Sequence, residues 1–224
     1  MNSAQVIEYG LCLLTGYLVG SINFAVLVAK SQGVNILEEG SGNPGATNVK
    51  RVLGKGAGNL VFGLDVCKGA IGTFLGFFIL WGIRSSWGES VKPEDDFSAY
   101  FGAANLKLIV SFAATILGHC FSVFLGFKGG KGVASTIGGL AIILAWPILI
   151  GLVIWVIAFY STKYVSVASM LLGISLPISC WALKGSSTQI IFAIVLALFN
   201  LWTHRTNIER LRQGTESRFG SPKK

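Results

Sequence analysis

Three polar segments, rich in glycine and basic residues, interrupt an otherwise apolar chain and are the part best suited to chemistry. We name them the first, second and third polar segments; they occupy residues 41–51, 127–135 and 204–216. Glycine lets backbone N–H groups approach a ligand closely, and Lys and Arg supply positive charge, a combination that suits phosphate. We expect the functional site where these three segments meet.

The first polar segment is expected to form a phosphate-binding turn. Gly42, Pro44 and Gly45 oppose a regular helix, so residues 45–48 are predicted to turn with exposed amides at the start of a short helix. Successive N–H groups there would form an anion-binding nest, and Arg51 would add a bidentate guanidinium. The alternative is a solvated loop whose basic residues only set membrane topology.

The second polar segment is a glycine loop between two basic residues. Lys128 and Lys131 flank Gly129 and Gly130, and a helix is expected to follow. The P-loop pattern of ATP-binding proteins is not met, because Gly132 stands where that pattern requires Ser or Thr. The loop still suits a single phosphate, and the alternative is again a basic loop that sets topology.

The third polar segment follows the last apolar stretch and combines four functional side chains. His204 and Asn207 are three residues apart, so on a helix they would share a face with Arg210. Glu216 is expected to hold the segment by pairing with an arginine. The alternative for the histidine is an ordinary residue of the membrane interface.

Polar residues within the apolar stretches are the remaining candidates. Asp65 and Lys68 are three residues apart and would pair across one helical turn, as a functional site or as a buried structural pair. From the sequence alone Ser166 and Ser169 are typical of capping or helix packing, and His119 of a buried hydrogen-bonding residue.

The composition is that of an integral membrane protein. Of 224 residues, 52% are hydrophobic and only 12% are charged, against about 25% in soluble domains. The net charge of +8 reports topology before it reports a ligand, and we expect no nucleic-acid partner. The four cysteines lie far apart in apolar stretches, so we expect neither a metal site nor a cofactor.

The apolar stretches predict an all-α fold with seven transmembrane helices. They cover residues 9–29, 57–83, 108–127, 132–162, 164–183 and 185–203. The 132–162 stretch has 31 residues, too many for one ordinary span, and Pro147 near its middle favours a turn there and two crossings. A single crossing is the alternative.

The distribution of basic residues favours seven spans with the N-terminus outside and the C-terminus in the cytoplasm. This topology puts 13 of the 18 Lys and Arg residues inside, with Arg84, Lys92, Lys107 and Lys184 outside. It also brings all three polar segments to the cytoplasmic face. The 84–104 stretch is then an external connector, residues 1–216 form one membrane domain, and residues 217–224 form a short, loose polar tail.

The polar segments resemble the three motifs of the bacterial acyl-phosphate:glycerol-3-phosphate acyltransferases of the PlsY type. The residues that carry the resemblance are S-G-N-P-G-A-T-N-V-x-R at 41–51, G-H-x-F-x-V-F-x-x-F-K-G-G-K-G-V-A at 118–134 and H-x-x-N-I-x-R-L-x-x-G-x-E at 204–216. The likeness runs from the first span to Glu216. Ser122 stands where the family usually has proline, and Ser135 where threonine is common.

The resemblance implies an activity and a place in the cell. A fatty acyl group would pass from acyl phosphate to the 1-hydroxyl of glycerol 3-phosphate, giving lysophosphatidic acid and inorganic phosphate for phospholipid synthesis. The site would face the cytoplasm at the bacterial inner membrane, in contact with membrane lipid. A phosphotransacylase that produces acyl phosphate is an implied partner.

The resemblance also implies roles for individual residues. The 45–48 turn would hold the phosphoryl group of acyl phosphate, and a substrate phosphate or His204 would accept the hydroxyl proton. The catalytic residues would be Ser41, Lys131, His204 and Asn207. The substrate-binding residues would be Gly45, Ala46, Thr47, Asn48, Arg51, Lys128, Gly129, Gly130, Ser166 and Ser169.

Two other functions use the same features. A membrane carrier for phosphate or phosphoesters would also need a basic, glycine-lined vestibule, although the sequence shows no inverted repeat. A lipid-binding scaffold would not require so many polar groups positioned by glycine. Product formation from acyl phosphate and glycerol 3-phosphate separates the enzyme from both.

Overall fold

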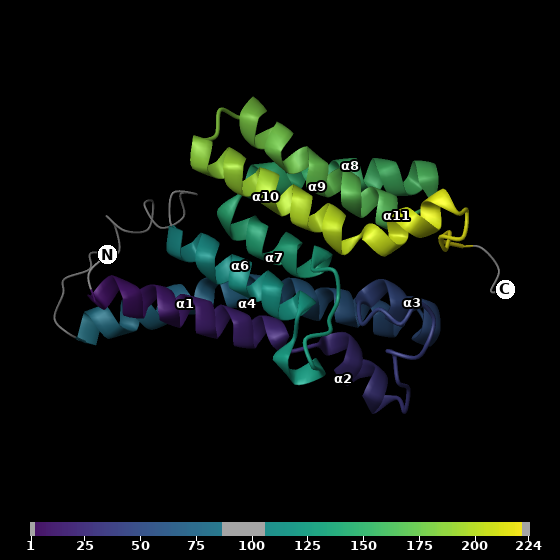
Figure 1. Cartoon of the computed structure of the whole chain (residues 1–224), viewed down its shortest axis with the longest axis horizontal. Coiled ribbons are helices and arrows are strands. Elements are labelled where there is room, and N and C mark those ends of the chain that lie inside the picture. Colours follow the sequence, from purple (N-terminus) through teal and green to yellow (C-terminus); the bar gives the residue numbers. More distant parts are fainter. Residues whose placement is uncertain (1–2, 87–105, 221–224) are drawn as a thin grey trace. The chain divides into compact units, whose positions relative to one another are not determined.

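The structure, a computed structural model, describes residues 3–86 and 106–220. The chain divides into two compact units, Met1–Ile143 and Leu144–Lys224 (Figure 1). The predicted external connector at 84–104 lies outside the described residues from residue 87 onward.

The Met1–Ile143 unit is built from helices and short turns. Helix α1 packs against α6 and α4, and α4 in turn contacts α3, α6 and α7 (Figure 1). The elements are α1 (Ser3–Ser21), α2 (Phe24–Ser31), α3 (Ala46–Leu53), α4 (Lys55–Ser86), α6 (Leu106–Cys120), the 3-10 turn η1 (Val123–Leu125) and α7 (Val133–Ile143).

Glycines let the helices of this unit approach to backbone contact. A Cβ atom added to Gly20 of α1 would overlap the Thr115 carbonyl of α6, and one on Gly138 of α7 would overlap the Val66 carbonyl of α4. Small residues at helix crossings favour association in membranes, where apolar burial gives little driving force. The helix pairs α1–α6 and α4–α7 therefore form a closely packed frame for the polar segments.

The first apolar stretch, predicted to be one continuous span at 9–29, breaks after Ser21. Asn23 caps α2 by accepting a hydrogen bond from a backbone N–H of its first turn. The carbonyls left unpaired at the break are satisfied from elsewhere: Ser122 Oγ donates to the Ser21 carbonyl at 2.6 Å, and Lys68 Nζ to the Ile22 carbonyl at 2.7 Å. Hydropathy could not reveal this break, because its polar partners are 101 and 46 residues away in sequence.

The third apolar stretch, predicted as a span at 108–127, forms a helix only as far as Cys120. The chain then turns, so that the Ser122 N–H donates to the Lys128 carbonyl at 3.3 Å, and Phe127 takes a left-handed φ of 61°. The predicted span was therefore too long at its C-terminal end. Helix α7 begins at Val133, directly after the second polar segment, as expected.

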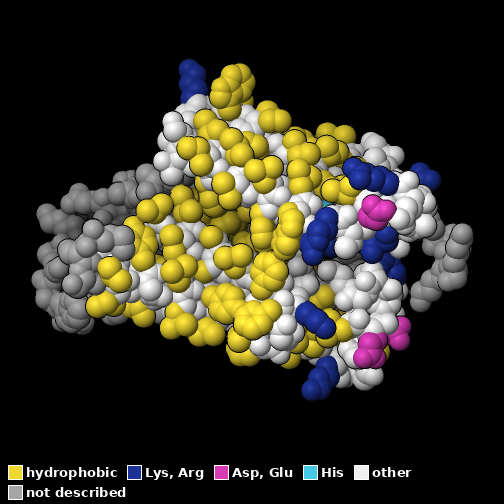
Figure 2. Space-filling view, viewed as in Figure 1, with side chains coloured by type: hydrophobic (Ala, Val, Ile, Leu, Met, Phe, Trp, Pro, Cys, Tyr) yellow, Lys and Arg dark blue, Asp and Glu magenta, His cyan; other side chains and the backbone are white. Residues whose placement is uncertain are grey.

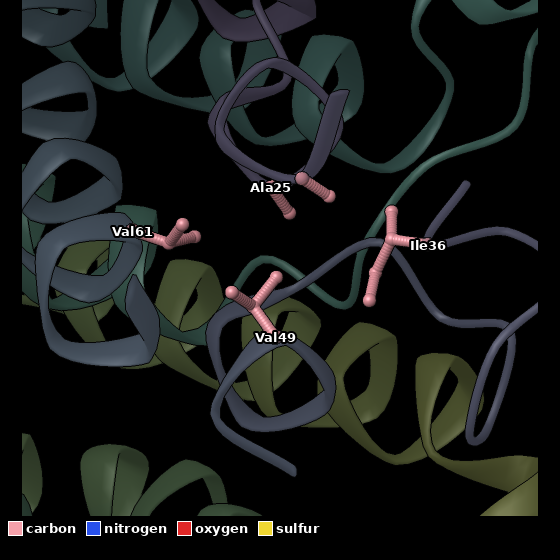
Figure 3. Close-up of a cluster of buried hydrophobic side chains, with 5 residues drawn as sticks. Ala25, Ile36, Val49 and Val61 are labelled. Atoms are coloured by element: carbon pink, nitrogen blue, oxygen red, sulfur yellow. The ribbon is translucent and has the colours of Figure 1, made fainter. Parts of the chain in front are cut away.

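A hydrophobic core fixes the short helix α3 in place. Figure 3 shows Ala25, Ile36, Val49 and Val61 pointing toward one another. They come from α2, the loop after it, α3 and α4. This core joins the first polar segment to the membrane helix α4.

The Leu144–Lys224 unit is a helical hairpin with a third helix and a bent end. Helix α9 packs against both α8 and α10, and α11 follows α10 at a bend of 55°. The elements are α8 (Ala145–Thr162), α9 (Val165–Ala182), α10 (Ser187–Thr203) and α11 (Arg205–Arg212). The predicted spans at 164–183 and 185–203 correspond to α9 and α10.

The long apolar stretch at 132–162 is broken, as Pro147 suggested, but at Leu144. Leu144 has φ −136° and ψ 57°, outside the helical region, and α8 begins at the next residue. Pro147 therefore lies in the first turn of α8, where a missing N–H leaves no helical hydrogen bond unmade. The break is confirmed, three residues earlier than the proline.

Within the described residues, three stretches are long and apolar enough to cross a membrane: Gln5–Ser31, Ala145–Thr162 and Val165–Ala182. The bent pair α10 and α11 would make a fourth, and Leu106–Cys120 and Val133–Ile143 are shorter apolar helices. Figure 2 shows hydrophobic side chains covering the helical flank of each unit. The fold is all-helical, while the count of seven spans stays a prediction.

Candidate functional site

The first polar segment begins the short helix that its glycines predicted. Gly45 is the N-cap residue of α3 and makes no side-chain cap, so the first N–H groups of the helix belong to Ala46 and Thr47. Thr47 is exposed and Ala46 is half-buried. An uncapped helix N-terminus of this kind suits an anion.

Asn48 holds this segment together from within. Its side-chain oxygen accepts hydrogen bonds from the Ser41 N–H at 2.9 Å and from Arg51 Nη1 at 3.3 Å. Its amide nitrogen donates to the carbonyls of Ile36 at 3.3 Å and Glu39 at 2.9 Å. The side chain is 1% exposed, and these four bonds fill its hydrogen-bonding capacity. Asn48, predicted to bind substrate, shapes the loop that carries Ser41 and orients Arg51.

The second polar segment is a loop closed onto His119. The Gly130 N–H donates to the His119 carbonyl at 3.1 Å, and a Cβ atom on Gly130 would overlap His119 Nε2. Gly129 likewise packs on the His119 backbone. Lys128 is exposed and Lys131 is half-buried. Both lysines flank the predicted glycine loop, whose close approach to His119 leaves no room for a Cβ atom at Gly129 or Gly130.

Asp65 and Lys68 pair as predicted, within a cluster that the sequence did not reveal. Lys68 Nζ lies 2.9 Å from Asp65 Oδ1 and 2.9 Å from His119 Nδ1. Ser135 Oγ lies 3.3 Å from His119 Nδ1. The three-residue spacing of Asp65 and Lys68 could be read from the sequence. The third member, His119, lies in α6, 51 residues after Lys68, and no local pattern connects it to the pair.

His204 lies at the bend between α10 and α11 and is only 3% exposed. Its Nδ1 atom is 2.8 Å from the Asn200 carbonyl. Because a carbonyl only accepts, Nδ1 carries the proton, and in the neutral ring Nε2 is the acceptor. Asn207 lies in the first turn of α11, and its N–H donates to the carbonyl of His204, the N-cap residue of that helix, at 2.8 Å.

Glu216 gathers three side chains of the Leu144–Lys224 unit. Oε1 accepts from Ser166 Oγ at 2.7 Å and from Asn207 Nδ2 at 2.6 Å, and Oε2 pairs with Arg210 Nε at 2.8 Å. Burial by itself would raise the pKa of Glu216, yet the hydrogen bonds from these three partners hold it below its ordinary value. The predicted arginine pair is confirmed; Ser166 and Asn207 as further partners were missed.

Further contacts in the Leu144–Lys224 unit involve Ser169 and the start of the predicted tail. Trp155 Nε1 donates to Ser169 Oγ at 3.2 Å, so Ser169 is buried under an aromatic side chain of α8. The predicted tail is described as far as residue 220 and makes contacts through Phe219. The Phe219 N–H donates to the Lys163 carbonyl at 2.8 Å, and its ring packs edge-on against Phe159.

The candidate residues therefore fall into two groups, one in each unit. The first and second polar segments belong to the Met1–Ile143 unit, and the third segment with both serines belongs to the Leu144–Lys224 unit. Within the described residues, no three His, Cys, Asp or Glu side chains form a candidate metal site. The first group offers backbone N–H groups and lysines, and the second offers a buried imidazole, an amide and a guanidinium.

Comparison with known proteins decides the family. The profile described as glycerol-3-phosphate acyltransferase matches residues 10–214. The chain belongs to this family. Curated relatives of that name include one from Endomicrobium trichonymphae, 39% identical over 209 residues that cover 93% of this chain and 94% of the relative. Another, from Aquifex aeolicus, is 37% identical over 207 residues, covering 92% and 97% of the two chains.

Solved structures of a glycerol-3-phosphate acyltransferase share the fold. The crystal structure of PlsY (YgiH), an integral membrane glycerol 3-phosphate acyltransferase, in its glycerol 3-phosphate form has a TM-score of 0.79 at 35% identity, covering 95% of this chain and 96% of PlsY. Its lysophosphatidic acid form gives a TM-score of 0.77 at the same identity. The chain is thus a membrane acyltransferase of phospholipid synthesis, of the PlsY type.

Proposed function

We propose that this acyltransferase moves a fatty acyl group from acyl phosphate to the 1-hydroxyl of glycerol 3-phosphate. The products are lysophosphatidic acid and inorganic phosphate. Membership of the glycerol-3-phosphate acyltransferase family supports the acceptor and the reaction type. The acyl-phosphate donor is supported by the motifs, and by two glycine-rich basic segments that suit one phosphate each.

The proposed roles divide between the two groups of residues. The turn at residues 45–48, at the start of α3, holds the phosphoryl group of acyl phosphate through the N–H groups of Ala46 and Thr47, because those of Gly45 and Asn48 donate to backbone carbonyls. Glycerol 3-phosphate and the reacting carbonyl are held by Ser41, Arg51, Lys128, Lys131, Gly129, Gly130, Ser166, Ser169, His204 and Asn207. Since both substrates are anions, a cationic pocket is needed to bring them together.

The chemistry needs orientation more than activation. Acyl phosphate is already a mixed anhydride: the glycerol oxygen bonds to its carbonyl carbon, the bond from that carbon to the phosphate oxygen breaks, and phosphate leaves. A phosphate oxygen of the substrate takes the hydroxyl proton, and His204 Nε2 is the alternative proton acceptor. The observation that supports the third segment most directly is the 2.8 Å contact of His204 Nδ1 with the Asn200 carbonyl, which leaves Nε2 as the acceptor.

We place the site at the cytoplasmic face of the bacterial inner membrane, on a protein with seven spans, an external N-terminus and a cytoplasmic C-terminus. The helix break at Leu144 and the basic residues of the polar segments support this topology. Residues 1–216 then act as one domain, followed by a short polar tail at 217–224. A phosphotransacylase would supply the acyl phosphate.

The test is turnover by the purified full-length chain. With acyl phosphate and glycerol 3-phosphate, we expect inorganic phosphate release matched by lysophosphatidic acid, and no product from acyl-CoA. Product from acyl-CoA alone would show that acyl-CoA, and not acyl phosphate, is the acyl donor. Absence of product with either donor would refute the assignment of the chain as an acyltransferase. His204→Ala and Lys131→Ala should lower turnover at least about a hundredfold, while the exposed neighbour Arg205→Ala should not. Wild-type rates in both site variants would refute the proposed site.

A further inference from the structure

Asp65, Lys68 and His119 form a buried cluster in the Met1–Ile143 unit, and none of the three was given a role in substrate binding above. These side chains are 2%, 3% and 4% exposed. Lys68 Nζ lies 2.7 Å from the Ile22 carbonyl, 2.9 Å from Asp65 Oδ1 and 2.9 Å from His119 Nδ1. An ammonium group has three N–H donors, and two of them are directed at the Ile22 carbonyl and His119 Nδ1.

Stability alone is a poor reason for such a cluster. A buried ion pair costs desolvation that its attraction barely recovers, and apolar side chains of similar volume serve as well or better. Asp65 Oδ1 lies at ion-pair distance from Lys68 but makes no hydrogen bond of good geometry within the described structure. Asp65 therefore neutralises the ammonium, and the directed hydrogen bonds of Lys68 go to Ile22 and His119.

The contact with Ile22 reaches the first polar segment. Ile22 and Asn23 form the break between α1 and α2, and Lys68 supplies the hydrogen bond that the Ile22 carbonyl lost there. Asn23 caps α2 and also donates from Nδ2 to the Pro44 carbonyl at 3.4 Å. Pro44 directly precedes Gly45, the N-cap of α3. The position of the turn thus depends on the geometry of the break.

The contact with His119 reaches the second polar segment. Because the ammonium donates to Nδ1, the proton of the neutral ring is on Nε2, the atom that faces Gly130. The His119 carbonyl accepts the Gly130 N–H at 3.1 Å. Ring and backbone of one residue therefore define where the glycine loop runs, and Lys68 fixes the ring.

We propose that Lys68, neutralised by Asp65, is a positioning residue that acts through Ile22 and His119 to hold the first and second polar segments in one geometry. None of the three cluster residues touches substrate. The inference rests on the proposed function in that these segments bind the two phosphates. Its signature is weaker substrate binding in a protein that remains folded.

The first test removes both charges at once. The double variant Asp65→Leu with Lys68→Met leaves no lone buried charge, so we expect it to fold, with a melting temperature lowered only by the lost hydrogen bonds to Ile22 and His119. We expect its KM for glycerol 3-phosphate to rise roughly tenfold or more, with a smaller change in kcat. Wild-type KM and kcat in the folded double variant would overturn the proposal.

A matched control removes another interhelical ion pair of the same unit. Lys107 pairs with Glu8 of α1 and contacts neither polar segment in the interactions described. Glu8→Leu with Lys107→Met should leave the KM unchanged. If this control raises the KM as much as the Lys68 double variant does, the loss is a general effect of helix packing, and the positioning role is wrong.

Amide hydrogen exchange reads the same geometry without turnover. Exchange at residues 41–48 and 128–131 should speed up in the Lys68 double variant and stay as in wild type in the Glu8–Lys107 control. Unchanged exchange in both stretches would overturn the proposal. If the wild-type chain forms no product with either donor, the proposed function fails, while the exchange data still decide this inference.

Substitution of His119 keeps the inference falsifiable if the double variant does not fold. In His119→Asn the side-chain oxygen occupies the place of Nδ1 and can accept from Lys68, whereas His119→Leu has no acceptor. We expect the Asn variant to keep a KM several-fold closer to wild type than the Leu variant. An equal KM in the two variants would contradict the role of this hydrogen bond.

Discussion

The first and third polar segments are held in place by different chemistry. Asn48, a neutral amide, makes three of its four hydrogen bonds to backbone groups and lies beside the apolar core around Val49. Glu216, a carboxylate, makes its hydrogen bonds to the side chains of Ser166, Asn207 and Arg210. We call these two residues hubs. Asn48 fixes the path of the backbone, and Glu216 fixes the orientation of neighbouring side chains.

The difference matches what each segment would contribute to a reaction. A segment that presents backbone N–H groups needs a fixed loop, and a neutral hub keeps that loop independent of pH and salt. A segment that presents an amide and a guanidinium needs fixed side chains, and an ionised carboxylate binds both strongly. The second arrangement works only while Glu216 is charged.

The largest effect is expected at Asn48. Asn48→Leu keeps the branched shape of the side chain but leaves the Ser41 N–H and the carbonyls of Ile36 and Glu39 without their partner. The buried Ile36 carbonyl alone accounts for about 1–3 kcal/mol, and the two part-buried groups add to this loss. Thermal unfolding in detergent should show a large drop in melting temperature, together with loss of turnover.

Asn59→Leu is the matched control for this substitution. Asn59 is exposed, and its hydrogen bond with Lys50 is also exposed. A substitution there should change stability by no more than about 0.5 kcal/mol. Equal losses at Asn48 and Asn59 would show that the four bonds of Asn48 are not the cause.

The next largest effect is expected at Glu216, on activity. Glu216→Gln preserves the shape but places an amide N–H₂ group or an uncharged oxygen against Arg210, so the ion pair is lost. We expect kcat/KM to fall roughly tenfold to a hundredfold, because Asn207 and Arg210 lose their common anchor. Glu209→Gln, at an exposed position of α11, should keep wild-type kinetics. Full activity in Glu216→Gln would refute the hub.

The sequence revealed the segments but not the hubs. Glycine and proline spacing predicted the turn at 45–48 and the loop at 128–131, because those constraints act within a few residues. Asn48 counted as a ligand contact, since its Ile36 and Glu39 partners are backbone atoms that no residue type marks. The likeness of the three motifs to a known family carried the functional interpretation further than any single spacing did.

Helix boundaries failed where long-range contacts decide them. The first apolar stretch has the composition of one uninterrupted span, yet it breaks at Ile22 because Lys68 and Ser122 supply the hydrogen bonds that the break removes. Pro147 marked the break in the 132–162 stretch, since a proline constrains its own neighbourhood. Local signals were readable from the sequence, and compensation from distant residues was not.

Acid should separate the two segments. The pKa of Glu216 is held below its ordinary value of 4.5, so its contribution to stability is complete above that pH and is lost as pH falls through the lowered value. Hydrogen exchange at residues 204–216 should therefore accelerate as pH falls below about 4.5, after correction for the intrinsic rate, and residues 41–48 should keep their protection. In Glu216→Gln the step in the third segment should vanish. A step of equal size in that variant would assign the titration to another group.

The smallest effect is expected at Ser166, and it sharpens the assignment of the two serines. Ser166 Oγ donates its hydrogen bond to Glu216 Oε1. Ser169 Oγ accepts a hydrogen bond from Trp155 Nε1, and its own O–H can donate to another acceptor. Ser166→Ala therefore removes one hydrogen bond of a carboxylate that retains two others. A loss of about 1 kcal/mol, or a few-fold in kcat/KM, should result.

Ser169→Ala should raise the KM more than Ser166→Ala does, if the Ser169 hydroxyl donates to a substrate oxygen. Steady-state kinetics of the two variants decide between them: a larger loss at Ser166 would mean that its hydroxyl leaves Glu216 and contacts the substrate during turnover.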